Sequence, residues 1–317
     1  MLDPILVPLD GSQLAECVLP HTTAIARSFD AQINLLCILE KQQASVSAQL
    51  FDLVNWQIKK TKTSLYLEKT KIGFQESGLQ AQAIIEEGLA AEEITKIAQK
   101  QRVKLIILSS HGQNGLTPWG ISSTSQKIIL SAPASVFIVR ANQPRASELS
   151  EKSPYQRILV PLDGSQRAEN VLPVITQLAR FHKSEVHLVQ VVQTPELARQ
   201  MPLTGNDIDL SNRLVARNQQ EAQNYLQQVK LRSYLEDISV QTHLITGDNA
   251  AAELHQLVDV EQINLVALSA HGYSGNHQWP YGSIPNNFML YGKSHLLIIQ
   301  DLPAKNGAIS FWEHAER

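Results

Sequence analysis

Residues 5–20 read ILVPLDGSQLAECVLP, and residues 158–173 read ILVPLDGSQRAENVLP. The two stretches are nearly identical, and each begins with a short apolar run that ends in a Pro-Leu-Asp-Gly-Ser turn. Similarity at a single long spacing indicates a duplicated domain and not a solenoid of short repeats. We therefore expect two copies of one domain in this chain.

A second pair of matching segments lies further along each copy. Residues 107–112 read ILSSHG, and residues 267–272 read ALSAHG. The same glycine, tryptophan and serine then follow at the same spacing in both copies, as Gly115, Trp119 and Ser123 in the first and Gly275, Trp279 and Ser283 in the second. The repeat therefore extends over most of each half.

The repeat also sets the expected domain boundaries. Between the copies, residues 142–156 are polar, contain prolines and show no apolar period, so we interpret them as a linker. Residues 303–317 resemble neither copy and are expected to form a tail. The predicted domains are residues 1–141 and 157–302.

Each copy alternates apolar strand-like runs with helical patterns. In the first copy the expected strands are 5–9, 33–39, 82–86, 105–109 and 135–140, with helices between them over 12–29, 43–77, 90–101 and 122–130. We expect Ser12 to cap the first helix and Pro20 to kink or interrupt it. The strands are continuous apolar runs, which is typical of strands covered on both faces. Strands that alternate with helices favour right-handed crossovers and a parallel sheet. The predicted fold class is therefore α/β, with two doubly wound domains, each a five-stranded parallel sheet with helices on both faces.

The composition narrows the possible partners and the compartment. The 317 residues are 43% hydrophobic and 18% charged, with a formal net charge of −3. This balance is globular, and it argues against nucleic acid or an acidic membrane surface as a partner. No apolar stretch approaches the roughly 20 residues needed to cross a bilayer, and the first residues lack a secretory signal. Cys17 and Cys37 lack metal-ligand spacing and are interpreted as reduced core thiols, so the expected location is cytoplasmic.

The expected ligand crevice lies beyond the carboxyl ends of the strands, at the switch point in strand order. This rule selects the turns after the first and fourth strands, where the repeat is most alike. Asp10 and Asp163 follow the first strands. Each carboxylate could accept hydrogen bonds from a sugar hydroxyl or a base amino group, or could cap the following helix. Both interpretations stay open from the sequence.

The turn after the fourth strand combines a glycine with a later helix start. Gly112 and Gly272 would let the backbone approach an anion closely. The serines at 122 and 123, and Gly282 with Ser283, then open a helix whose free N–H groups suit a phosphate. The alternative is a long surface loop with an ordinary helix cap, which Ser123 and Gln126 would fit.

Taken together, these motifs resemble the universal stress protein family, over nearly the whole of both copies. ATP-binding members of that family carry G-x-x-G-x9-G-[ST] after the fourth strand and an aspartate after the first. The resemblance implies a fold like that of the adenine nucleotide alpha hydrolases, ATP as ligand, and Mg²⁺ or Mn²⁺ as ions that could accompany it. It also implies a role in stress response or signalling. Family members often dimerise through the last strand, which implies an intramolecular pseudo-dimer here, with a homodimer of the whole chain and other protein partners left open.

The resemblance also implies which residues would bind the nucleotide. The aspartates would lie at the adenosine end and the residues at the ends of the second strands against the base, while the glycines and serines would surround ribose and phosphates. In the second copy the implied set is Pro161, Asp163, Val191, Ser269, His271, Gly272, Gly282 and Ser283. In the first copy it is Pro8, Asp10, Ile38, Ser109, His111, Gly112, Ser122 and Ser123.

Both copies depart from the family motif. Its first glycine is Ser109 in one copy and Ser269 in the other, and its last glycine is retained as Gly282 but replaced by Ser122. A serine is tolerated at such a position if φ is negative and strained if φ is positive. Neither loop has a lysine or arginine between the glycine and the helix, so backbone N–H groups and a metal would have to balance a triphosphate. The second copy is therefore the predicted site of ATP.

His111 and His271 precede the loop glycines and could act as general bases or could orient the loop. No second titratable group recurs beside them in sequence, so we favour orientation and predict no catalytic residue. Slow ATP hydrolysis stays open as an activity. The alternative function is a nucleotide-independent interaction protein that uses the duplicated domains as a fixed pseudo-dimer with relic sites.

Overall fold

The computed structural model describes residues 2–40, 49–113, 115–116, 120–141, 154–194, 205–232, 235–273 and 280–301. In domain 1 the strands are β1 (Ile5–Pro8), β2 (Ile33–Leu39), β3 (Ala81–Glu87), β4 (Leu105–Ser109) and β5 (Ser135–Val139). Its helices are η1 (Ala15–Cys17, a short 3-10 helix), α1 (Val18–Phe29), α2 (Gln49–Glu76), α3 (Ala90–Lys100) and α4 (Ser123–Ser131). The predicted alternation of strands and helices is confirmed.

Domain 2 repeats this order. Its strands are β6 (Arg157–Pro161), β7 (Glu185–Gln193), β8 (Ser239–Gly247), β9 (Leu265–Ser269) and β10 (His295–Ile299). Its helices are η2 (Ala168–Val171, also 3-10), α5 (Leu172–His182), α6 (Gly205–Lys230), α7 (Ala250–Val260) and α8 (Ser283–Tyr291).

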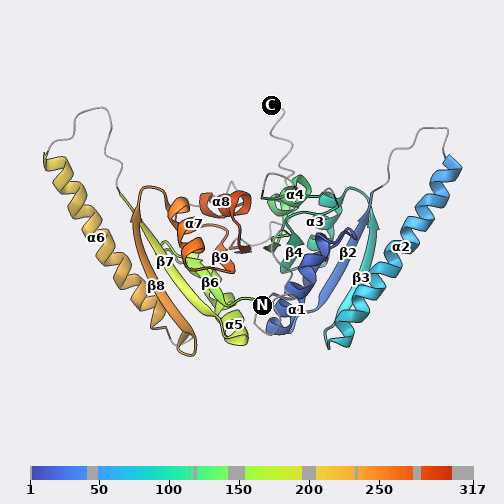
Figure 1. Cartoon of the computed structure of the whole chain (residues 1–317), viewed down its shortest axis with the longest axis horizontal. Helices are drawn as coiled ribbons and strands as arrows, with labels where there is room; N and C mark the ends of the chain where they lie inside the picture. The colour runs from blue at the N-terminus through green and yellow to red at the C-terminus, as the bar shows by residue number, and fades with distance from the viewer. Residues whose placement is uncertain are drawn as a thin grey trace.

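The two five-stranded sheets join into one sheet of ten strands, in the order β3-β2-β1-β4-β5-β10-β9-β6-β7-β8. The strands within each half pair in parallel, which confirms the predicted doubly wound fold. The last strands of the halves pair antiparallel, with Phe137 opposite Leu297. Figure 1 shows the resulting molecule, in which the two halves spread outward from this central pair. A pseudo-dimer is thus built within one chain.

Helices cover both faces of the sheet. One apolar cluster packs under α1, α2, α5 and α6, and it runs through both domains. The other cluster packs under α3, α4, α7 and α8. The central strands β4, β5, β9 and β10 are buried at every position. Side chains that point to opposite faces of these strands therefore supply both cores.

The outermost strands differ from the expected pattern of burial on both faces. Neither β3 nor β8 has a fully buried residue, and β8 alternates between exposed and partly buried residues along most of its length. Each lies at an end of the ten-stranded sheet, where it has one strand neighbour instead of two. An edge strand with one solvent-facing side alternates in this way.

The start of the first helix also differs from the expectation. Ser12 does act as a cap, because its Oγ accepts a hydrogen bond from the Ala15 N–H at 3.1 Å. The interruption, however, lies at the change from η1 to α1 and not at Pro20. Pro20 falls in the first turn of α1, where its missing N–H has no intrahelical partner to lose.

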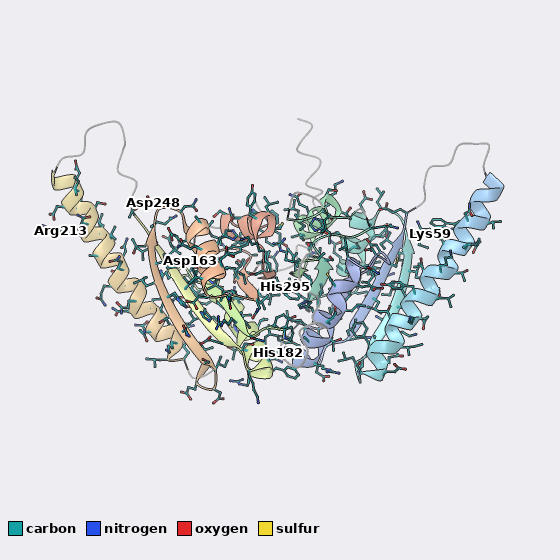
Figure 2. All side chains as sticks on the ribbon, in the orientation of Figure 1. Lys59, Asp163, His182, Arg213, Asp248 and His295 are labelled. Atoms are coloured by element: carbon teal, nitrogen blue, oxygen red, sulfur yellow. The ribbon has the colours of Figure 1, made fainter. Side chains whose placement is uncertain are left out.

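Buried aromatic side chains fill the junction between the domains. His21 Nδ1 lies 3.0 Å from the Tyr155 hydroxyl, and the rings of His21 and His295 are 4.3 Å apart. Figure 2 places His182 and His295 in this central region. Burial lowers the pKa of His21 to about 4, and burial with nearby Arg140 holds the pKa of His295 well below its ordinary value. Tyr155 is fully buried, although the sequence suggested a linker there.

Arg140 fastens domain 1 to one helix of domain 2. Its guanidinium donates to the carbonyls of Phe288 at 2.7 Å and Met289 at 3.2 Å, near the C-terminal end of α8, and to that of Gly120 at 2.7 Å. A cation at the C-terminal end of a helix is favourable because the last carbonyls carry partial negative charge. Domain 1 thereby holds one end of α8.

Among the helices that the structure describes, none is both long and apolar enough to cross a membrane.

Candidate functional site

A cavity of about 470 Å³ opens in domain 2 at the carboxyl ends of the strands. All eight residues predicted for the second copy line it. They come from the end of β6 and the turn after it, from β7, from the end of β9 and the turn after it, and from the start of α8. The strand-order rule selected the turns after β6 and β9, which the fold brings together around one space, and the family resemblance supplied Val191 in β7.

Apolar side chains form much of the cavity wall. They come from the ends of the strands and from α7, and they are Leu162, Val189, Val191, Leu254 and Leu268. Ligand cavities are commonly apolar, with a few polar groups that fix orientation. The polar groups lie along the turns after β6 and β9.

Asp163 joins these two turns. Its Oδ1 accepts a hydrogen bond from Ser165 N at 2.9 Å, and its Oδ2 accepts one from Tyr273 N at 2.6 Å. Asp10 does the same in domain 1, with Ser12 N at 2.9 Å and Gln113 N at 2.6 Å. Bonds from backbone N–H groups to a carboxylate are charge-assisted and strong. Each aspartate thus clamps the first turn to the later loop, which neither sequence interpretation had described.

The clamp explains the loop glycines. A Cβ atom at Gly272 would overlap Asp163 Oδ2, and one at Gly112 would overlap Asp10 Oδ2. The expectation that these glycines allow close approach to an anion is therefore met by a carboxylate of the protein itself.

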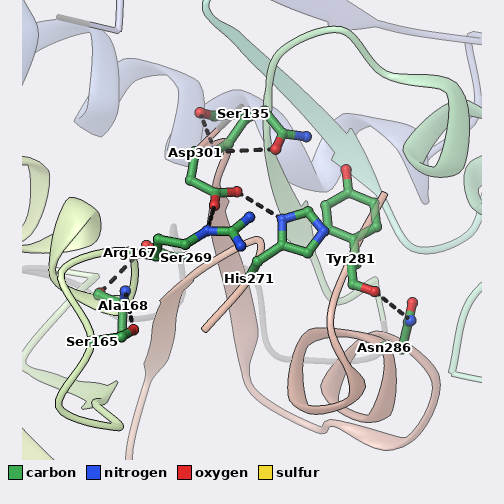
Figure 3. Close-up of polar contacts among 10 residues, drawn as sticks. Ser135, Ser165, Arg167, Ala168, Ser269, His271, Tyr281, Asn286 and Asp301 are labelled. Carbon is green, nitrogen blue, oxygen red and sulfur yellow. Dashed lines mark hydrogen bonds and ion pairs between the residues drawn. The ribbon is translucent and has the colours of Figure 1, made fainter. Parts of the chain in front are cut away.

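His271 lies in a chain of polar contacts that continues to Asp301 and the partly exposed Arg167 (Figure 3). His271 Nδ1 is 2.8 Å from Asp301 Oδ1, and Arg167 Nε is 2.7 Å from Asp301 Oδ2. The side chains of His271 and Asp301 are each only 1% exposed. A titratable partner therefore does stand beside this histidine, although none is close to it in sequence.

Domain 1 lacks this chain. The positions that match Arg167 and Asp301 in the repeat are Leu14 and Ala141. His111 instead lies with its Nδ1 3.1 Å from the hydroxyl of Ser110. Leu14 and Arg167 are one of the few differences between the two otherwise matching first turns, so the sequence does indicate that the domains differ here. Nothing in the sequence linked Arg167 to Asp301.

The two helix starts after the loops also differ. Gly282 has φ −72°, and Ser122, its counterpart, has φ −72°. The serine in domain 1 is therefore unstrained. Ser122 Oγ accepts from Ser125 N at 3.1 Å and so caps α4, whereas no side chain caps α8. Pro285, which matches Ser125 in the repeat, has no N–H to be capped.

The serines that replace the first motif glycine are accommodated by hydrogen bonds in both copies. Ser109 and Ser269 are the last residues of β4 and β9, and both are buried. Ser109 Oγ accepts from His111 N at 3.3 Å, and Ser269 Oγ donates to the carbonyl of Ala168 at 3.4 Å. These hydrogen bonds place serine in the strand end without an unpaired hydroxyl.

The remaining residues predicted for domain 1 keep the same places in the fold. Pro8 ends β1, Ile38 lies near the end of β2 and Ser123 begins α4. Cys37, beside Ile38, is a free thiol, and its pKa is raised to about 11 by burial and then by the Asp10 carboxylate. Cys17 likewise forms no disulfide with any described residue, and its Sγ lies 3.4 Å from Ser109 Oγ. The prediction of reduced cysteines is consistent with both.

A metal site is not evident around the cavity. The described residues hold no group of three histidine, cysteine, aspartate or glutamate side chains that could bind an ion. Asp163 is the one carboxylate that lines the cavity, and both of its oxygens already accept hydrogen bonds. Trp119 and Trp279, which the sequence places in the loops, lie outside the described residues.

The fold and the cavity together define a tandem α/β protein with a ligand-sized space at the switch point of a parallel sheet. The chain belongs to the universal stress protein family, whose model matches residues 1–140 and again residues 154–300. Over 149 residues it is 28% identical to the universal stress protein YxiE of Bacillus subtilis, covering 44% of this chain and 100% of YxiE. One copy thus corresponds to the whole of that relative.

Solved structures extend the similarity to both domains at once. A putative universal stress protein from Pseudomonas aeruginosa aligns with a TM-score of 0.65 and 15% identity, over 94% of this chain and 93% of that one. A universal stress protein from Archaeoglobus fulgidus aligns with a TM-score of 0.64 and 16% identity, over 95% of this chain and 99% of that one. At these identities the likeness shows the shared fold.

Proposed function

We propose that this protein acts in stress response or signalling by binding an adenine nucleotide in domain 2. The observation that carries the proposal is the cavity of about 470 Å³, which is lined by every residue predicted for the second copy. Family membership supplies the adenine nucleotide as the ligand class. Val191 and its apolar neighbours would face the base, and Ser283 with the start of α8 would face the phosphate.

Domain 1 serves, in this proposal, as a structural partner. Asp10 and Gly112 preserve the clamp between its two turns, which supports the fold with or without a ligand. Ser122 places a hydroxyl at the start of α4, where Gly282 of domain 2 has no side chain, and this hydroxyl takes up space that a phosphate would need. The alternative function, a nucleotide-independent interaction protein, finds its support in this half of the molecule.

Calorimetric titration with AMP, ADP and ATP tests the proposal when it is combined with a matched pair of variants. Val191→Arg would fill the cavity, and Ile38→Arg makes the same change at the corresponding position of domain 1. We expect the first variant to lose binding and the second to keep it, with both still folded by circular dichroism. No heat with any adenine nucleotide, or equal loss in both variants, would refute nucleotide binding in domain 2.

A further inference from the structure

The charge around the domain 2 cavity restricts which adenine nucleotide it can hold. No lysine or arginine is among the residues that line the cavity, and Asp163 is the one formally charged side chain among them apart from the titratable His271. Residues 272–292, which contain the loop and α8, hold no lysine or arginine in sequence. A polyphosphate would therefore meet a carboxylate without a described lining cation to offset it.

The backbone donors point the same way. Ser165 N and Tyr273 N, which flank the cavity, already donate to Asp163. At the start of α8 the first two residues, Ser283 and Ile284, have N–H groups without intrahelical partners. The third residue, Pro285, has no N–H. The uncapped helix start thus offers two N–H groups and the Ser283 hydroxyl, enough for one phosphate group.

Arg167 does not supply the positive charge that the cavity lining lacks. It is outside the lining set, and its Nε pairs with Asp301 at 2.7 Å, where Asp301 also holds His271. A Mg²⁺ ion could bridge phosphate oxygens, but Asp163 is the one carboxylate among the described lining residues, so the ion's other ligands near the described residues would be mainly water.

We infer that the domain 2 cavity selects adenosine or a monophosphate of adenosine over ATP. The inference rests on the proposed function, since it specifies which member of the adenine nucleotide class the same cavity takes. One phosphate is met by the N–H groups of Ser283 and Ile284, and the second and third phosphates of ATP find no described protein partner of opposite charge.

Calorimetric titration of the full chain with adenosine, AMP and ATP, each with and without Mg²⁺, tests this selection. We expect AMP to bind at least about tenfold more tightly than ATP under both conditions, which corresponds to about 1.4 kcal/mol. ATP binding as tightly as AMP, or more tightly, would overturn the inference while leaving the proposed function intact. Absence of binding by all three would overturn both.

A pair of charge variants on α8 makes the test independent of the ligand series. Asn286 lines the cavity, whereas Tyr291 on the same helix is 60% exposed and does not. Asn286→Lys is expected to bring ATP affinity up by about tenfold relative to adenosine, because it supplies the missing cation. Tyr291→Lys adds the same charge outside the cavity and is expected to leave the ratio unchanged. A ratio that fails to move in a folded Asn286→Lys protein would contradict the role given to charge.

Discussion

The turns after β1 and β6 are almost identical, yet the two domains differ in what surrounds them. Asp10 and Asp163 make matching pairs of hydrogen bonds at the same lengths, to the turn and to the later loop. Both halves keep this contact, although domain 2 has the described cavity and domain 1 has a capped α4. The fold alone therefore explains it. The hydrogen bonds of Asp10 and Asp163 therefore have a structural role, and their presence does not show which domain binds a ligand.

The informative positions are those where the halves diverge. Asp301 and Arg167 in domain 2 stand where Ala141 and Leu14 stand in domain 1, and Gly282 stands where Ser122 does. Each change in domain 2 either fixes a polar side chain at the cavity or leaves the start of α8 uncapped. Positions that differ between two copies in one chain are therefore the candidates for a role specific to one half, whereas positions kept in both are explained by the shared fold.

The largest expected effect comes from Asp301, the feature most specific to domain 2. Asp301→Ala would leave Arg167 and His271 without their shared carboxylate, and because Asp301 is buried while Arg167 is 29% exposed, the expected cost is at the lower end for a buried pair, about 3 kcal/mol of unfolding free energy. Urea denaturation measures it. Asp259→Ala breaks the exposed pair with Lys293 and should change stability by less than about 0.5 kcal/mol. A loss below about 1 kcal/mol for Asp301→Ala would show that the chain contributes little.

The two domains also contribute different residues to the junction between them, and the pH dependence of protein stability should reveal this difference. His21 and His295 are matched in the repeat by Val174 and Ser135. Because the pKa of His21 is lowered to about 4, the unfolded chain binds this proton more readily than the folded one. Stability is therefore retained above the unfolded value of about 6.5 and falls by about 3 kcal/mol as the pH drops toward 4.

Urea denaturation between pH 4 and pH 7 measures this slope, and His21→Gln should reduce it. Glutamine keeps a hydrogen-bonding group near the Tyr155 hydroxyl but does not titrate. If the variant shows the same slope as the parent protein, the loss of stability comes from groups elsewhere.

A glycine pair compares the two loops directly. Gly272→Ala places a Cβ against Asp163 and should move the loop beside the cavity, weakening AMP binding by about thirtyfold, or about 2 kcal/mol. Gly112→Ala causes the same overlap in domain 1 and should destabilise the protein by a similar amount without changing AMP affinity. Calorimetric titration and thermal unfolding together separate the effects. Equal loss of affinity in both would place nucleotide in both halves.

The smallest effect is expected from exchanging the helix starts. Gly282→Ser would place a hydroxyl at the start of α8, where the Ile284 N–H is the donor it can engage because Pro285 has none, and this oxygen would compete with a phosphate, lowering AMP affinity by about fivefold, or about 1 kcal/mol. Ser122→Gly should cost only a few tenths of a kcal/mol in stability. Unchanged AMP affinity in Gly282→Ser would mean that the phosphate is held elsewhere.

Sequence reasoning reached the fold and the two turns that border the domain 2 cavity because those features are local, whereas the family resemblance supplied other lining residues such as Val191. An apolar run that ends in a turn predicts a strand end, and strand ends of a doubly wound sheet meet at one edge. The link from His271 to Asp301 is of another kind, because it depends on register. Ser269 pairs with Ile299 in β9 and β10, so residues two positions further along each strand come to lie side by side. Such pairing cannot be read from either segment alone.

The joining of the sheets was also beyond the sequence itself. β5 reads SVFIV and β10 reads HLLII, which are ordinary buried strands with no mark of antiparallel pairing. Only the family resemblance suggested contact through the last strand. Arg140, whose guanidinium reaches three carbonyls across this junction and that of Gly120 in its own domain, gave no local signal because its partners are more than a hundred residues away or in an adjacent loop.

The β5–β10 pair has a consequence for how this molecule can evolve and operate. When two separate chains meet through a strand edge, the fraction assembled depends on concentration, whereas a linker raises the effective concentration of the second half. Here the junction forms within one polypeptide, so the fraction of molecules with paired halves does not depend on protein concentration. A mutation in one half is also never imposed on its partner, as symmetry would require in a homodimer. The β5–β10 pairing thus keeps two unlike domains together in every copy of this chain.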